Sequence, residues 1–156
     1  MASRIDKYPE TETFIYYNRN PKNKITGDCA IRAISTALDQ DYNKTLMEMA
    51  ELSCKTGYMF NDKKGIDRYL TSKGWVKHKQ PRKSDNTKYT GKEWCEYISA
   101  FDPYAYSRNI VANIGGHHIV AILPTGENKD RQNYKVHDTW NSTYKCVGNY
   151  WVKEND

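Results

Sequence analysis

Apolar residues recur at helical spacing between residues 29 and 38, where they form the wide stripe Ala30, Ile31, Ala33, Ile34, Ala37 and Leu38. This period predicts an amphipathic helix with one face in the core. The preceding loop ends in Thr26-Gly27-Asp28, so either Thr26 or Asp28 is placed to cap the helix. Cys29 would then be the first helical residue.

The same spacing and its end signals predict three more helices. Residues 41–57 carry a second stripe, with Asn43 as the candidate cap and Gly57 as the stop. Residues 63–74 form a shorter amphipathic segment that ends at Gly74. Thr90 precedes a fourth stripe and has Glu93 three residues later, which is the pattern of a capping box.

Short β-branched and aromatic segments dominate the C-terminal third. They predict strands over residues 109–115, 118–123, 133–138 and 149–152, with shorter candidates at 14–17, as an edge strand, and at 75–78. Helices that precede strands, without alternation, indicate an α+β fold. We therefore expect N-terminal helices, with the Cys29 helix packed on a C-terminal antiparallel sheet.

The composition fits one soluble domain. The chain has 156 residues, of which 38% are hydrophobic and 28% charged, enough apolar material for a core without disulfides. No N-terminal stretch resembles a signal peptide, and no apolar run approaches the ~20 residues of a membrane span. We expect a single domain over 1–156 in the cytoplasm, with no membrane partner. The oligomeric state is not encoded in these patterns.

The net charge is +5, and its densest basic stretch covers residues 77–88. No aromatic residue is interleaved with these charges, as would be needed for stacking on bases. We therefore expect a solvated surface loop and no nucleic-acid partner.

The four cysteines, Cys29, Cys54, Cys95 and Cys146, show none of the close pairs typical of zinc sites. We expect free thiols, as in reducing compartments. No metal or organic cofactor is implied.

One cysteine has the surroundings that a nucleophile needs. A thiolate is favoured by the positive end of a helix dipole and by a histidine that takes its proton, and such a histidine is usually oriented by Asp or Asn. If Leu123 pairs with Asn133 in a hairpin, His118 lies directly opposite Asp138. His117 would face Thr139 instead.

The segments GDCAIRA, HHIVAI and VHDTW resemble the three active-site segments of papain-like cysteine peptidases. Asp138-Thr139-Trp140 matches the third segment, and the short spacing is nearer the compact bacterial or phage members. Asn23 lies six residues before Cys29, where these enzymes often carry a Gln that binds the oxyanion. A weaker resemblance links GDCAIRAIS to OTU deubiquitinases, although the Asp expected three residues before the cysteine is missing.

The resemblance implies a hydrolase, specifically a thiol protease with a Cys29–His118–Asp138 triad that cleaves a peptide, isopeptide or other amide bond of a protein or peptide substrate. Asn23 and the Cys29 backbone N–H would bind the oxyanion. Asp28, His117 and Trp140 are expected to line the site. Two alternatives stay open: a transglutaminase-like or cell-wall amidase acyl-transfer enzyme, and a catalytically inactive papain-like module that binds a protein or nucleic acid.

Overall fold

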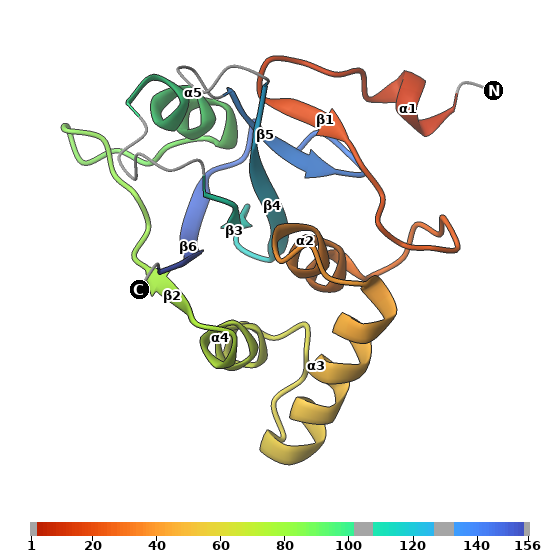
Figure 1. Ribbon diagram of the computed structural model, residues 1–156. Coiled ribbons are helices and arrows are strands. Elements are labelled where there is room, and N and C mark those ends of the chain that lie inside the picture. The colour runs from red at the N-terminus through yellow and green to blue at the C-terminus, as the bar shows by residue number, and fades with distance from the viewer. Residues whose placement is uncertain (1–2, 102–107, 127–132, 155–156) are drawn as a thin grey trace.

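A computed structural model describes residues 3–101, 108–126 and 133–154. Among these residues it contains five helices and one six-stranded sheet of order β1-β5-β4-β3-β6-β2 (Figure 1). The helices are α1 (Arg4–Lys7), α2 (Cys29–Ala37), α3 (Tyr42–Thr56), α4 (Lys63–Ser72) and α5 (Gly91–Phe101). The strands are β1 (Phe14–Tyr16), β2 (Trp75–His78), β3 (Ile110–Ile114), β4 (His118–Thr125), β5 (Asn133–Asp138) and β6 (Val147–Lys153). The α+β class is therefore confirmed.

The sheet separates two hydrophobic clusters because side chains alternate between its faces. On one face, α2, α3 and α4 pack against Ile119, Ala121 and Trp151. On the other face, α5 packs against Val120 and Ile122. The Cys29 helix thus lies directly on the central strand β4, as expected.

The expectation of an antiparallel sheet is wrong at one edge. Strand β1 pairs with β5 in parallel, with Phe14 opposite Val136, so the sheet is mixed. The edge position itself is as predicted, since β1 lies outermost next to β5 (Figure 1). The side chain of Phe14 is fully buried, and this apolar anchor fixes β1 against the sheet. The opposite edge, β2, also comes from the N-terminal half of the chain.

Helix ends follow the predicted signals in most cases. Thr90 and Glu93 form the reciprocal capping box, with hydrogen bonds of 3.0 and 3.1 Å. Gly57 ends α3 in the left-handed conformation at φ 80°. Asn43 is not the cap of α3, because it is the second residue of the helix and lies two positions after the cap. The carboxylate of Asp41 caps instead, accepting from the Lys44 backbone N–H at 3.0 Å.

The β4–β5 register differs from the expected one by two residues. Leu123 pairs with Lys135 rather than Asn133, and the last pair of the ladder is Ala121 with His137. His118 pairs on its other side, with Ile114 of β3. A shift of two preserves the face on which each side chain lies, whereas a shift of one would have reversed it. Part of the expected loop between these strands, 127–132, lies outside the described residues.

The basic stretch 77–88 begins with the last two residues of β2 and continues into a largely exposed turn closed by a bridge between Arg82 and Lys88. It is therefore a surface segment, as expected. All four cysteines are free thiols. Within the described ranges, no helix has both the length and the apolar character that crossing a bilayer requires.

Candidate active site

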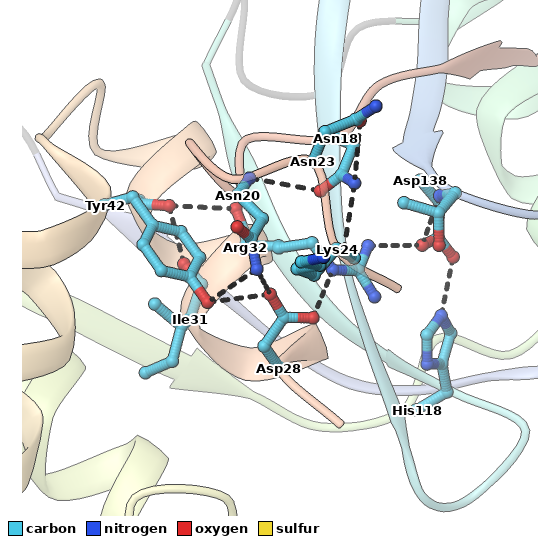
Figure 2. A network of polar contacts seen from close by, with 12 residues as sticks. Asn18, Asn20, Asn23, Lys24, Asp28, Ile31, Arg32, Tyr42, His118 and Asp138 are labelled. Carbon is cyan, nitrogen blue, oxygen red and sulfur yellow. Dashed lines mark hydrogen bonds and ion pairs between the residues drawn. The ribbon is translucent and has the colours of Figure 1, made fainter. Parts of the chain in front are cut away.

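Three segments that are distant in sequence converge at one end of the sheet. Cys29 begins α2, His118 begins β4, and Asp138 ends β5. The His118 Nε2 lies 2.5 Å from Asp138 Oδ2, and Figure 2 shows the imidazole directed at this carboxylate. Since β4 and β5 are shifted by two residues, the pair meets diagonally across the strands rather than face to face.

The thiol of Cys29 is half-buried and interacts with the His118 side chain and with the backbone of Ile119. Burial raises the pKa of this thiol. These two interactions and the positive charges of His118 and Arg32 outweigh burial, so the pKa of Cys29 is lowered overall. The position at a helix N-terminus acts in the same direction. The arrangement favours a thiolate.

The imidazole of His118 is held in its charged form. Burial lowers its pKa, but the hydrogen bonds to Asp138 and Cys29 raise it to about 9. Because Nε2 faces Asp138, Nδ1 is the ring nitrogen left to face the thiol. With the pKa of Cys29 lowered and that of His118 raised, the geometry stabilises a thiolate–imidazolium pair.

The buried guanidinium of Arg32 also belongs to the site, although the sequence patterns assign it no role. Its Nη1 lies 3.0 Å from Asp138 Oδ1, and its Nε lies 2.8 Å from Asp28 Oδ1. Figure 2 shows Arg32 reaching from α2 toward the Asp138 carboxylate, which also binds His118. Asp138 Oδ1 accepts a further hydrogen bond, of 2.7 Å, from the Thr139 backbone N–H. These contacts leave the carboxylate little rotational freedom.

Asp28 is buried and anchors this network instead of capping α2. Its side chain makes no cap hydrogen bond, because its oxygens already accept from Arg32, from Tyr42 Oη at 2.7 Å and from Asn20 Nδ2 at 3.1 Å. Burial raises the pKa of Asp28, and the contacts with Arg32, Tyr42 and Asn20 lower it more strongly. The sequence contains one signal of this network, because the charged residue Arg32 lies inside the apolar stripe of α2.

Trp140 covers the histidine. The ring centroids of His118 and Trp140 are 4.9 Å apart at an interplanar angle of 41°, so the indole shields the His118–Asp138 pair on one side. Thr139, between Asp138 and Trp140, accepts a 2.7 Å hydrogen bond at its carbonyl from Arg4 Nε. The two predicted lining residues Asp28 and Trp140 therefore both lie at the site.

Two other predicted residues, His117 and Asn23, are exposed, unlike the residues of the cluster. His117 is exposed in the turn before β4. Asn23 is exposed, has a left-handed backbone at φ 53°, and accepts a 3.4 Å hydrogen bond from Asn18 at its Oδ1. Its assignment as an oxyanion ligand stays a prediction. The backbone N–H groups at the start of α2 are donors next to the thiol, since the first turn of a helix leaves them without helical acceptors.

The part of the chain that the structure describes contains no group of three or more His, Cys, Asp or Glu side chains placed to hold a metal ion. No protein-family model matches the sequence, and neither a curated protein nor a solved structure matches it. The chemistry must therefore be inferred from the side chains themselves.

Proposed function

We propose that this chain is a papain-like cysteine hydrolase that cleaves a peptide, isopeptide or other amide bond of a protein or peptide in the cytoplasm. The observation that carries the proposal is the hydrogen-bonded pair His118–Asp138, whose imidazole interacts with the thiol of Cys29 at the N-terminus of α2. A thiolate next to an oriented imidazolium is the arrangement that acyl transfer to sulfur requires.

In the first half-reaction the Cys29 thiolate attacks the carbonyl carbon, and the carbonyl electron pair moves to oxygen. The Cys29 backbone N–H and Asn23 are the proposed donors to this oxyanion, a donor type worth ~3–4 kcal/mol of barrier. The intermediate then collapses and the C–N bond breaks. The His118 proton passes to the departing amine, which leaves a thioester on Cys29 and a neutral imidazole.

In the second half-reaction a water molecule attacks the thioester while neutral His118 accepts its proton. The second intermediate breaks its C–S bond, which releases the carboxylic acid and restores the thiolate–imidazolium pair. Asp138 keeps the imidazole oriented through both steps, and Arg32 keeps Asp138 in place through its 3.0 Å contact. No step needs a cofactor.

The test is a comparison of cells that express the wild-type chain or Cys29→Ala, with mass-spectrometric detection of new protein N-termini and of new side-chain cross-links. We expect new termini that disappear with Cys29→Ala and persist with the matched control Cys54→Ala, which removes an exposed thiol outside the site. Cross-links to amines that depend on Cys29 would instead favour the transglutaminase-like alternative. Binding partners without any covalent change would favour the inactive module.

A further inference from the structure

A polar cavity of about 460 Å³ lies on the sheet beside the β3–β4 turn. Strands β3 and β6 supply Asn113, Gly148 and Asn149, the turn supplies Gly116, and Lys63 and Lys88 contribute the charges. No part of the proposed acyl transfer uses these residues.

Only a few residues separate the cavity from Cys29, the proposed nucleophile. Asn113 on β3 pairs with Ile119 on β4, and the backbone N–H of Ile119 contacts the Cys29 thiol. Neighbouring strands are about 4.8 Å apart, so the cavity wall lies within one or two residues' reach of the thiol for an extended substrate. Gly116 also precedes His118 by only two residues. A chain that is bound at Cys29 and runs across β4 toward β3 would reach this cavity.

The charge of the cavity has one sign. Lys63 and Lys88 are both exposed and line it, and no Asp or Glu does so. Within the described residues neither ammonium group is in ion-pair distance of a carboxylate, whereas nearby Lys83 is paired with Glu93. Two positive charges without a protein counter-ion favour an anionic group in the cavity.

The wall between these lysines offers hydrogen-bond donors on a fixed backbone. Asn113 is buried and held by its own 3.1 Å hydrogen bond to the Gly116 carbonyl. Gly148 has to lack a side chain here, because a Cβ would approach Asn113 Oδ1 to 2.8 Å. The Nδ2 of Asn149 is buried and has no hydrogen-bond partner in the described part of the chain. A rotation of this amide about χ2, a soft torsion, would direct the donor at a bound oxygen.

We propose that this cavity binds a carboxylate of the polypeptide substrate, within a few residues of the bond presented to Cys29. This inference rests on the proposed function, because it assumes that the bound polypeptide is a substrate of Cys29. The preference of the cavity for a carboxylate can be tested without turnover. The carboxylate can come from an Asp or Glu side chain or from a free C-terminus. These two sources share the same recognition chemistry.

The experiment is an NMR titration of ¹⁵N-labelled Cys29→Ala protein with three small probes. N-acetyl-glutamate α-amide supplies a side-chain carboxylate, N-acetyl-glycine supplies a terminal carboxylate, and N-acetyl-glutamine α-amide is the neutral control. We expect saturable shifts of the Gly116, Gly148 and Asn149 amides with at least one acid, and about tenfold weaker binding of the neutral probe. The acid that binds more tightly identifies the source.

The variants locate the charge effect. Lys63→Gln with Lys88→Gln should weaken binding of the acid about tenfold, since a partly exposed ion pair is worth a factor of two to five. Lys64→Gln is the matched control, because Lys64 adjoins Lys63 on α4 but its ammonium lies over the Tyr58 ring, 5.3 Å from the centroid. It should change binding less than twofold. The amide spectra show directly that each variant is folded.

The proposal is overturned if the acids shift no cavity amides, if the glutamine probe binds equally well, or if the double lysine variant binds like the wild type. Tighter binding of inorganic phosphate than of either carboxylate would also overturn it. These outcomes are separate from the failure of the proposed function. If Cys29 is reactive but the cavity does not distinguish the acids from the neutral probe, only this inference fails. If the cavity binds carboxylates but Cys29 is inert, the proposed hydrolase function fails.

Discussion

Helices α2 and α5 pack on opposite faces of the same sheet, and each carries a cysteine, yet their thiols have opposite properties. Cys95 lies within α5 and is fully buried among apolar residues such as Trp94 and Ile98. Burial is the main reason that the pKa of Cys95 is raised. Cys29 begins α2, and its contacts with His118 outweigh burial and lower its pKa.

The comparison shows that residue type and burial alone do not set the pKa of a thiol. Both thiols pay a desolvation penalty, which disfavours the thiolate. Only Cys29 has an imidazole partner, and this imidazole is itself held by a carboxylate that a buried arginine fixes. In the candidate site, Arg32 therefore holds Asp138, Asp138 holds His118, and His118 faces Cys29. These charged groups lie in an otherwise apolar interface between α2 and the sheet.

The largest effect should come from the two cysteines themselves. Cys29→Ala should lower turnover of any cleaved substrate by about 10⁴-fold or more, as expected when the nucleophile of an acyl-transfer enzyme is removed. Cys95→Ala should leave turnover within a factor of two or three and should cost about 1–2 kcal/mol of unfolding free energy through lost packing. Kinetics and denaturant unfolding of both variants measure the contrast. A Cys95 variant that is folded but inactive would reverse it.

Arg32→Met should produce the next largest effect. It leaves Asp28 and Asp138 buried without their shared cation, and loss of one partner from a buried ion pair costs about 3–5 kcal/mol. Arg32→Lys keeps the charge but cannot reach both carboxylates with one planar group, so we expect partial recovery. Thermal unfolding measures stability, and the pH profile of Cys29 alkylation reports whether the His118–Asp138 pair has moved.

Asp138→Asn should lower the reactivity of Cys29 considerably, although an amide can still accept a hydrogen bond from His118. The carboxylate serves His118, Arg32 and the Thr139 N–H at once, and an amide has only one accepting oxygen for these donors. We expect a loss of about 10-fold to 100-fold in the alkylation rate of Cys29 at pH 6.5, with Asp138→Ala worse still. His117→Ala is the matched control, since this neighbouring imidazole is exposed, and it should have little effect.

The smallest effect concerns pH and stability. The pKa of His118 is raised from 6.5 to about 9 in the folded protein, so the folded state binds this proton more tightly than the unfolded state. The resulting stabilisation is complete below pH 6.5 and is lost as the pH rises through 9. A Cys29→Ala background removes the opposing thiol titration and also the thiol's own share of the His118 shift. The remaining contact with Asp138 should still make the unfolding free energy fall by about 1–2 kcal/mol as the pH rises above 6.5. The same decline after His118→Gln would assign it to another group.

The candidate site could be predicted from the sequence because each of its main residues carries a local signal. Cys29 follows a loop and precedes a helical stripe, His118 begins a β-branched, apolar segment, and Asp138 ends a short segment that contains Tyr134 and Val136. The predicted β4–β5 register was wrong by two, yet the His118–Asp138 contact formed because an even shift keeps the face. The alternation of side chains along each strand therefore determined the face on which His118 and Asp138 lie. The connection between β4 and β5, which sets the register, carries no comparable sequence pattern.

The role of Arg32 and the parallel pairing of β1 could not be predicted from local sequence patterns. The ion pair of Arg32 with Asp138 joins residues 106 positions apart, and nothing near Arg32 in sequence indicates its second carboxylate. The direction in which β1 joins β5 likewise depends on where a long connection returns. Both features arise from tertiary packing, which overrides local preference.

The central claim, that Cys29 is a nucleophile activated by His118 and Asp138, is tested most directly by the pH dependence of alkylation of all four thiols in the folded wild-type protein. Isotope-coded iodoacetamide and peptide mass spectrometry give each rate separately. We predict that Cys29 is labelled fastest below pH 7, that its rate reaches half its plateau at a lower pH than the ~8.5 of a free thiol, and that His118→Ala moves this midpoint upward. Cys95 should stay unlabelled until the protein unfolds. A Cys29 rate no faster than those of the exposed Cys54 and Cys146, with a midpoint that His118→Ala leaves unchanged, would contradict the account.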